Sequence, residues 1–370
     1  MFELTNEQRK YFGITPVSSS WDLIKLIPSP YDKHVTLAYF DGNTICKKVL
    51  VGENSYMECD LNEETTSSRT ELLPKTARGK IVKLTSSTLS KRTPRGMYFS
   101  YNGGYVETGK WETNRTIYNS YIEDMKLNNF EDLSCWVKQW IADTTKTDLN
   151  EIAEFSSSAI KHCKYHAGDF FRLKLNRRLY GYGRILLDYD KMRKEKIKFW
   201  DILMGKPLVI NLYHIATTNN NISCEYLKEL QTIPSQFIMD NAFFYGEYEV
   251  IGNIPLADNE LDYPVMYGKS INYLDSNKVL LQSGQNYFEL KNADRALYSD
   301  FRNNGVGFGL HVNLPILKRC IEQNNNQPYW EQNSYGTNTD LRNPKFYAER
   351  EAICKQFGVS EKDIFLKMTL

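Results

Sequence analysis

The sequence predicts an α+β fold built from antiparallel, β-rich sheets with clustered helices and divided into two domains. Short runs rich in β-branched and aromatic residues follow one another in the first third of the chain and again after Gly168, with turn-forming residues between them. Helical periodicity is confined to a few segments and does not alternate with strands, as it would in a doubly wound sheet. At 370 residues the chain exceeds the size that one hydrophobic core usually serves, which favours two domains.

Composition narrows the class of protein further. Aromatic residues make up 13% of the chain and include 25 Tyr, which favours half-buried strand faces and contact surfaces. The net charge of +1 gives no generic affinity for nucleic acid or an anionic membrane. The seven Cys are scattered, and neither a signal peptide nor an apolar run of about 20 residues is evident. We therefore expect a cytoplasmic protein with reduced thiols and no membrane span.

The first third of the chain reads as antiparallel hairpins. Gly42 and Gly52 lie in polar turns between three of the expected strands, and Gly103-Gly104 form the turn of a further hairpin. Residues 62–80 are polar and contain Pro74, so a long loop is expected there. The strands are expected at residues 21–28, 34–40, 45–51, 55–61, 97–101 and 105–109.

Two amphipathic helices follow and mark the boundary between the domains. Apolar residues spaced three and four apart predict a helix over residues 129–144. Asp148 and Glu151 have the spacing of a capping box for a second helix. The apolar positions assigned to this second helix are Leu149, Ile152, Ala153, Ile160 and Cys163. The predicted division is an N-terminal β-rich domain at 1–145, a helical linker at 146–165 and a C-terminal α+β domain at 166–370 with its core at 168–256.

The C-terminal part is expected to return to strands and short helices. Asn313 is a suitable N-cap for a helix over 313–323, and Gly358 is placed to end the last helix. Strands are expected at residues 170–175, 179–187, 208–216, 247–253, 278–282 and 287–290, and the other helices at 223–231 and 345–357.

Several motifs suggest chemistry, and each also has a structural explanation. His162, Cys163 and His166 are three metal-ligand types in five residues, but a tetrahedral zinc site needs a second ligand pair, which the sequence does not show. Gly305, Gly307 and Gly309 could cradle a phosphate or simply form a tight turn, since the Rossmann and Walker spacings are absent.

Charged segments offer two contrasting kinds of contact. The run 191–198 is basic and is followed by Phe199 and Trp200, which suits either a nucleic-acid strand or a solvated helix face. The alternating acidic residues of 258–262, with two glutamates upstream, could steer the protein towards a basic partner or form a solvated turn. Nucleophile motifs such as Gly-x-Ser-x-Gly and His-Glu-x-x-His are absent.

Three ordered motifs resemble the immunity protein 26 family. They read Gly-Asp-Phe-Phe-Arg-Leu at 168–173, Leu-Tyr-Gly-Tyr-Gly-Arg-Ile-Leu at 179–186 and Tyr-Gly-Glu-Tyr-Glu-Val-Ile-Gly-Asn-Ile-Pro-Leu at 245–256. Gly181 and Gly183 alternate with tyrosines in one predicted strand, where glycine leaves room for a ring or a backbone to approach the sheet. These motif residues therefore define the domain itself. Residues 1–145 resemble a leading region of longer members.

The resemblance implies a bacterial protein that neutralises a polymorphic toxin in the cytoplasm by covering its active cleft. It implies no catalytic residue, no cofactor and no metal. The partner would be the cognate protein toxin, for which a nuclease with a basic cleft is one candidate, and nucleic acid itself is not expected to be a partner. The expected contact residues are Tyr180, Tyr182, Trp200, Tyr245, Glu247, Glu249, Asp258, Glu260 and Asp262.

Two other functions stay open from the sequence alone. Family groupings place an organophosphate-hydrolysing phosphotriesterase beside the immunity proteins, although clustered His and carboxylate ligands are not evident here. A nucleic-acid-binding adaptor would use the basic run 191–198. The oligomeric state is left undetermined.

Overall fold

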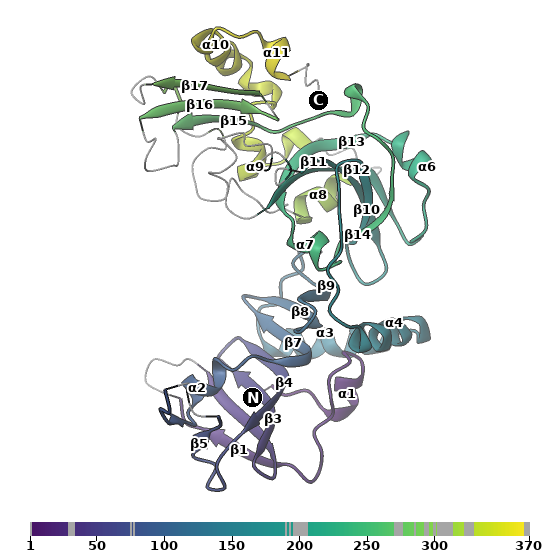
Figure 1. The fold of residues 1–370 in the computed structure, drawn as a ribbon. Helices are drawn as coiled ribbons and strands as arrows, with labels where there is room; N and C mark the ends of the chain where they lie inside the picture. The colour runs from purple at the N-terminus through teal and green to yellow at the C-terminus, as the bar shows by residue number, and fades with distance from the viewer. Residues whose placement is uncertain are drawn as a thin grey trace. The chain divides into compact units, whose positions relative to one another are not determined.

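The computed structural model describes two compact units, Met1–Lys161 and His162–Leu370 (Figure 1). The described residues are 2–28, 34–74, 76, 78–188, 191, 194, 206–269, 277–284, 286–291, 296–298, 301, 314–321 and 329–365. All of its sheets are antiparallel and helices cluster between and after them, so the α+β prediction is confirmed. The finer division at residues 145 and 165 stays a prediction.

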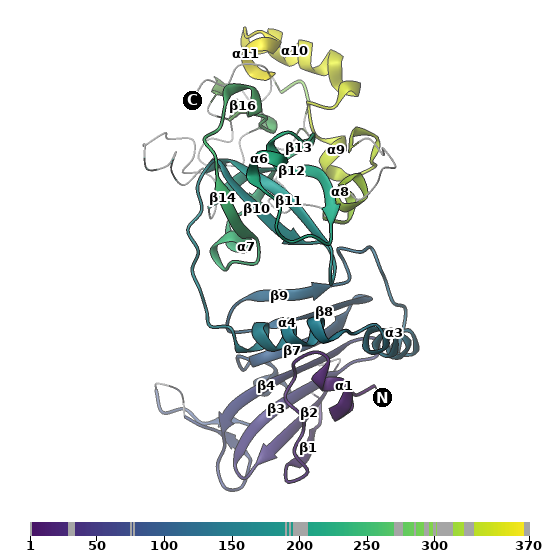
Figure 2. The same ribbon diagram turned by 90° about the vertical axis from the view of Figure 1, so that its right-hand side faces the viewer.

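The N-terminal unit contains a sheet with the strand order β1-β2-β3-β4-β7-β8-β9 (Figure 2). Neighbouring strands are joined mainly by tight turns, in which Gly42, Gly103 and Gly104 adopt positive φ angles of 55°, 60° and 90°. The strands are β1 Asp22–Leu26, β2 Val35–Asp41, β3 Thr44–Val51, β4 Tyr56–Glu64, β7 Arg95–Asn102, β8 Tyr105–Lys110 and β9 Arg115–Asn119.

The predicted long loop at 62–80 is partly wrong. Strand β4 continues to Glu64, and β5 (Glu71–Leu72) pairs with β6 (Val82–Lys83) beyond it. Leu72, which is fully buried, packs with α2 (Ser86–Ser90) against the face of β2–β4 opposite the main core. This apolar contact is what orders a segment whose composition is polar.

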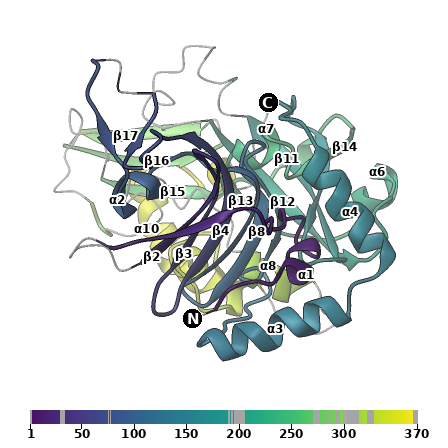
Figure 3. The same cartoon turned by 90° about the horizontal axis from the view of Figure 1, so that it is seen from below.

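Two helices complete the N-terminal unit, and Figure 3 shows them as separate rods following one another beside the sheet. Helix α3 (Phe130–Ala142) begins at Asn129, whose side chain accepts from two backbone N–H groups, and α4 (Lys146–Ser157) begins at Thr145. The capping box of α4 therefore pairs Thr145 with Asp148, and the predicted pair of Asp148 with Glu151 is wrong. Ile160 and Cys163 also lie beyond the end of this helix.

An aromatic core fixes α3 against one face of the sheet. Trp136 and Trp140 pack against each other and against Tyr118 of β9, with ring centroids 4.7–5.7 Å apart. Phe12 from the N-terminal segment stacks on the same pair and meets Phe99 of β7 at 4.8 Å. Rings of this size bury much apolar area, so this face holds the main core of the unit.

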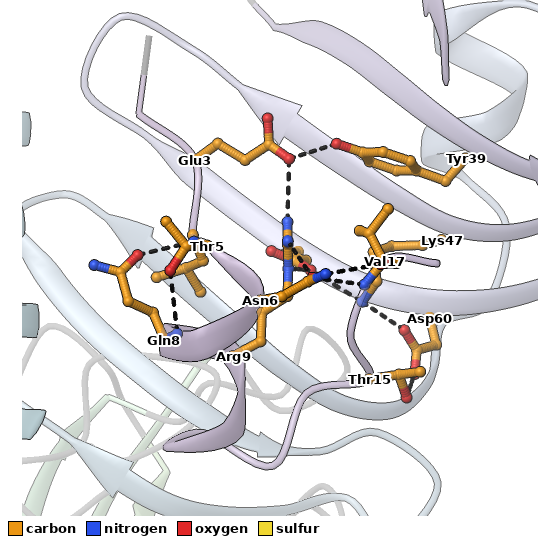
Figure 4. A network of polar contacts seen from close by, with 12 residues as sticks. Glu3, Thr5, Asn6, Gln8, Arg9, Thr15, Val17, Tyr39, Lys47 and Asp60 are labelled. Atoms are coloured by element: carbon orange, nitrogen blue, oxygen red, sulfur yellow. Dashed lines mark hydrogen bonds and ion pairs between the residues drawn. The ribbon is translucent and has the colours of Figure 1, made fainter. Parts of the chain in front are cut away.

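A network of buried charges lies on the same face, beneath the short helix α1 (Asn6–Lys10) (Figure 4). The Glu58 carboxylate is fully buried and lies 2.7 Å from Nε of Arg9 and 2.9 Å from Nζ of Lys47. Its second oxygen accepts from the Tyr56 hydroxyl at 2.6 Å. Lys47 also pairs with Asp60 at 2.7 Å. The segment before β1 is thus tied to the sheet by paired, hydrogen-bonded charges.

The C-terminal unit contains a sheet with the order β13-β12-β11-β10-β14 and a smaller one with the order β15-β16-β17. Their strands are β10 Asp169–Lys174, β11 Tyr180–Asp188, β12 Pro207–Thr217, β13 Thr232–Met239, β14 Glu249–Asn253, β15 Val265–Lys269, β16 Lys278–Ser283 and β17 Asn286–Lys291. The helices are α6 Cys224–Lys228, α7 Asn241–Phe244, α8 Leu314–Ile321, α9 Tyr335–Asn338, α10 Tyr347–Phe357 and α11 Glu361–Phe365, with 3₁₀ turns η2 Asp258–Glu260, η5 Tyr329–Glu331 and η6 Pro344–Phe346.

Most of the predicted C-terminal elements are confirmed within one or two residues, but some were missed. Gly358 ends α10 with a positive φ of 67°, as its position indicates. Strands β13 and β15 were not predicted, and the proposed cap Asn313 lies outside the described residues. No helix in the described part of the chain is both long and apolar enough to cross a membrane.

Removal of the central carboxylate should destabilise the N-terminal unit strongly. We expect Glu58→Gln to lower the free energy of unfolding by about 3–5 kcal/mol, because Arg9 and Lys47 would stay buried without their shared counter-charge. Urea unfolding followed by tryptophan fluorescence measures this. The matched control is Glu7→Gln, which breaks a solvent-exposed pair with Lys10 and should leave the urea midpoint nearly unchanged. Equal effects for the two variants would contradict the assigned role.

Acid should weaken the same network. Burial disfavours the Glu58 carboxylate, but the charge of Lys47 and the hydrogen bond from Arg9 outweigh it and lower the pKa of Glu58 below its ordinary value. A depressed carboxyl pKa contributes stability that is fully present above the unfolded pKa, roughly 4.3, and is lost as pH falls through the folded pKa. Urea midpoints of the wild type should therefore drop below about pH 4.3 more steeply than those of Glu58→Gln. Parallel pH profiles would contradict this.

Candidate partner-binding surface

The β10–β11 hairpin is shaped by glycines that let the chain pack closely. A Cβ on Gly183 would lie 2.3 Å from the Asn211 carbonyl oxygen of β12 and 2.5 Å from the Phe171 ring. Neither the backbone nor a buried ring can retreat, so glycine is required there. A Cβ on Gly181 would meet Leu175 at 3.2 Å. Both glycines face the same packed side of the sheet. Tyr182, which lies between them, faces the other side.

The side chains on that other face come from matched positions of neighbouring strands. The pairing register sets Arg172 of β10 opposite Tyr182 of β11 and opposite Glu249 of β14. Lys174 lies opposite Tyr180 in the same hairpin. The sheet therefore gathers residues that are up to 77 positions apart in the chain.

Arg172 is the centre of a polar cluster at this place. Its Nε and Nη2 donate to the same Glu249 oxygen at 3.0 and 2.7 Å, and Nη1 donates to the backbone carbonyl of Asn220. The guanidinium lies 5.8 Å from the centre of the Tyr180 ring, and the Lys174 ammonium lies 5.9 Å from the same centre. We call Arg172, Lys174, Tyr180 and Glu249 the Arg172 surface.

The two tyrosines predicted as contacts differ in exposure. Tyr180 is half-buried and belongs to the Arg172 surface. Tyr182 is fully buried and packs with Phe170, Tyr213 and Leu227. Its hydroxyl donates to the Asn219 carbonyl at 2.6 Å. Tyr182 thus has no exposed surface to offer a partner in this structure, and its ring belongs to the core.

Glu260 is held inside the unit by a buried arginine. The Arg184 side chain is 1% exposed, pairs with Glu260 and donates to the Ile254 and Pro255 carbonyls at 2.6 and 3.2 Å. Its guanidinium also lies 4.5 Å from the centre of the Phe170 ring. These contacts tie β11 to the segment that follows β14. The fold therefore uses Glu260 as the counter-charge of Arg184.

Asp262 has a comparable role with a second buried arginine. Arg342 pairs with Asp262 at 2.8 Å and with Asp340 at 2.7 Å, and it donates to the Ser235 carbonyl at 2.7 Å. Asp262 also accepts from the Ser235 backbone N–H at 2.7 Å. The pair connects strand β13 to the C-terminal helical region. Two of the five acidic residues predicted as contacts thus pair with buried arginines, in addition to Glu249, which pairs with Arg172.

The remaining predicted contacts are distributed over separate positions. Glu247 and Asp258 are exposed, at the approach to β14 and in η2. Tyr245 is half-buried at the end of α7, where its ring meets the exposed His162 ring edge-on at 6.0 Å. Trp200 lies outside the described residues. The structure therefore brings together Tyr180 and Glu249, but not the whole predicted set.

The structure describes the His162–Cys163–His166 motif but only a small part of the other two motifs. His162 stacks on Phe244 at 4.3 Å, and Cys163 donates its backbone N–H to the Phe244 carbonyl at 2.8 Å. Within the described residues no group of three or more His, Cys, Asp or Glu side chains is arranged to hold a metal ion. Nearly all of the basic run 191–198 and the glycines of 305–309 lie outside those residues.

Comparison with known proteins supports the resemblance found in the motifs. The model of the immunity protein 26 family matches residues 166–279. This range contains all five strands of the sheet that carries the Arg172 surface. No curated protein and no solved structure matched the chain. The expected resemblance is confirmed for this segment, and we call residues 166–279 the immunity protein 26 region.

Sequence reasoning missed the arginines that organise the immunity protein 26 region. Arg172 and Arg184 both lie inside the motifs, at positions within predicted strands. An arginine at an inward or sheet-centred position of a strand is unusual and needs a partner, which is the signal that could have identified it. Arg342 gave no such signal, because two of its partners, Asp262 and Ser235, lie 80 and 107 positions earlier.

Loss of the Arg184 counter-charge should unfold the immunity protein 26 region more readily. We expect Glu260→Gln to lower its free energy of unfolding by about 3–5 kcal/mol, because a buried guanidinium would lose its carboxylate. Thermal unfolding followed by circular dichroism measures the change. Asp258→Asn is the matched control, since Asp258 is an exposed acid in the same 3₁₀ turn and its loss should cost at most about 0.5 kcal/mol. If Glu260→Gln left the thermal stability unchanged, the Arg184–Glu260 pair would not be required for folding.

Proposed function

We propose that this protein is an immunity protein that binds a cognate bacterial polymorphic toxin in the cytoplasm and blocks its active cleft. The observation that carries the proposal is the match of residues 166–279 to the immunity protein 26 family, over the sheet that presents the Arg172 surface. The proposed inhibition is by occlusion, so the immunity protein performs no chemistry itself.

The geometry of the Arg172 surface suits recognition of another protein. Arginine and tyrosine are the residue types that most often dominate the energy of protein interfaces. Arg172 is held by Glu249 and by the Asn220 carbonyl, so its side chain is ordered before a partner arrives. A pre-ordered side chain loses less conformational entropy on binding, which leaves more of the contact energy for affinity.

Exposed acidic residues of the same unit favour a partner with positive charge. Glu247, Glu249 and Asp258 are exposed, whereas Glu260 and Asp262 pair with buried arginines. These three exposed carboxylates, of which Glu249 already pairs with Arg172, would attract a toxin with a basic cleft, such as a nuclease. Their contribution would appear mainly in the association rate, because exposed charges steer diffusion but are well solvated.

The Arg172 surface should be required for protection from the toxin. The test is co-expression with the toxin encoded beside this gene, together with affinity measured by calorimetry. Arg172→Ala and Tyr180→Ala should each weaken binding by about thirtyfold and restore toxicity, as expected for central contact residues. Tyr226→Ala is the matched control, since this exposed ring of α6 lies outside the surface. Full protection by both surface variants would place the interface elsewhere, and no protection by the wild type would refute the function.

Removal of the three exposed acids should slow association with the toxin. The triple variant Glu247→Gln, Glu249→Gln, Asp258→Asn should reduce the association rate about tenfold at low ionic strength, and this difference should shrink as salt is added. Surface plasmon resonance over a salt series measures it. A variant with three exposed acids removed from the N-terminal unit, Glu7→Gln, Glu131→Gln and Glu154→Gln, controls for net charge. Equal slowing in both triple variants would remove any specific role for the acids.

A further inference from the structure

The N-terminal unit has a second sheet face whose side chains no part of the proposed toxin contact uses. Helix α3 and the N-terminal segment pack on one face through Phe99, Tyr118 and Trp136. Side chains alternate along a strand, so the intervening residues of β7, β8 and β9 face the other way. This opposite face carries Tyr98, Ser100, Tyr105, Glu107 and Asn119.

Aromatic rings run along this face in two pairs. The Tyr98 ring lies over Gly109, because a Cβ there would come within 3.0 Å of a ring carbon and 2.9 Å of the hydroxyl. Trp111, just beyond β8, meets Tyr98 edge-on with ring centroids 5.9 Å apart. Tyr105 and Tyr121 form the second edge-on pair at 5.1 Å.

Glu107 lies between these pairs and is held in a fixed orientation. It is two residues after Tyr105 on β8 and therefore points to the same side. One carboxylate oxygen accepts from the Tyr98 hydroxyl at 2.5 Å and the other accepts from the Asn119 amide at 3.0 Å. Both donors are neutral, so the negative charge of Glu107 is oriented but not neutralised by them.

Two rows of residues cross the sheet at this place. Across the sheet the register places Met57, Ser100, Glu107 and Asn119 in one row. Cys59, Tyr98 and Gly109 form the next row. The second row continues from Cys59 to Lys48, but the buried Lys48 ammonium donates to the Leu89, Ser90 and Arg92 carbonyls. This leaves the Glu107 carboxylate among four electron-rich rings.

Solvent reaches these rings. Trp111 is 42% exposed and Tyr121 is 44% exposed, which is high for such large apolar side chains. Tyr98, Tyr105 and Glu107 are half-buried. We define Tyr98, Tyr105, Glu107, Trp111 and Tyr121 as the Glu107 aromatic face.

We propose that the Glu107 aromatic face is a second docking site, which receives an arginine or lysine side chain from a basic segment of a protein partner. A carboxylate gives such a cation a direct ion pair, and the faces of tyrosine and tryptophan rings attract it through their quadrupoles. The charge complementarity rests on the Glu107 carboxylate, since the ammonium of Lys48 in the second row is bound by three backbone carbonyls. This site lies outside residues 166–279 and is independent of the Arg172 surface.

The site can be tested on the full-length chain with a labelled oligo-arginine peptide, using fluorescence anisotropy at physiological salt. The wild type should bind this peptide, and Glu107→Gln and Trp111→Ala should each weaken binding about fivefold. Glu154→Gln, an exposed acid on α4, and Tyr226→Ala are matched controls that should leave the affinity unchanged. An oligo-glutamate peptide should not bind.

Trp111 is exposed and Glu107 changes by one atom, so these variants keep the core intact, and circular dichroism verifies their fold. Equal oligo-arginine affinity in the wild type and both variants would overturn the proposal, as would failure of the wild type to bind. Dimerisation of the wild type that Trp111→Ala abolishes would instead assign the face to a second copy of this chain and would also overturn it. Because the Arg172 surface is unchanged in these variants, loss of oligo-arginine binding leaves the proposed toxin contact untouched.

Discussion

The C-terminal sheet depends on one buried guanidinium. Arg184 holds the Ile254 and Pro255 carbonyls and the Glu260 carboxylate, so it fixes where the chain runs after β14. Strand β14 in turn sets Glu249 beside Arg172. Removal of the charge of Arg184 would therefore disturb the Arg172 surface indirectly. The side chains of that surface are positioned by the register of β10, β11 and β14.

Both units contain buried arginines that pair with carboxylates. Each buries arginines beside opposite charges, as in the pairs Arg9–Glu58, Arg184–Glu260 and Arg342–Asp262. Arg184 and Arg342 donate to backbone carbonyls as well. A buried ion pair is weak evidence for net stability, since desolvation offsets much of its attraction. Its value here is geometric, because an arginine with several fixed partners leaves its segment only one arrangement.

The sequence predicted the hairpins better than the contacts. Turn chemistry such as Asn102-Gly103-Gly104 is local, so the strands on either side were located within a few residues. Strand β13 was missed because Pro234 argues against a strand, yet β13 lies at a sheet edge, where proline is tolerated. The partial exposure of Tyr180 and the burial of Tyr182 could not be distinguished, since both face one side of the sheet and Tyr213 and Leu227, which cover Tyr182, are distant in the sequence. The roles of Glu260 and Asp262 depend on arginines far away in the chain.

The interior position of Gly183 has a consequence for how such a protein can change over generations. A side chain at Gly183 would collide with the neighbouring strand, whereas Lys174 and Glu249 at the margin of the same sheet reach solvent. Substitutions at such solvent-accessible positions can therefore change which partner is bound without preventing folding. Under the proposed immunity function, a few substitutions at the margin would change which toxin is bound while the scaffold stays the same.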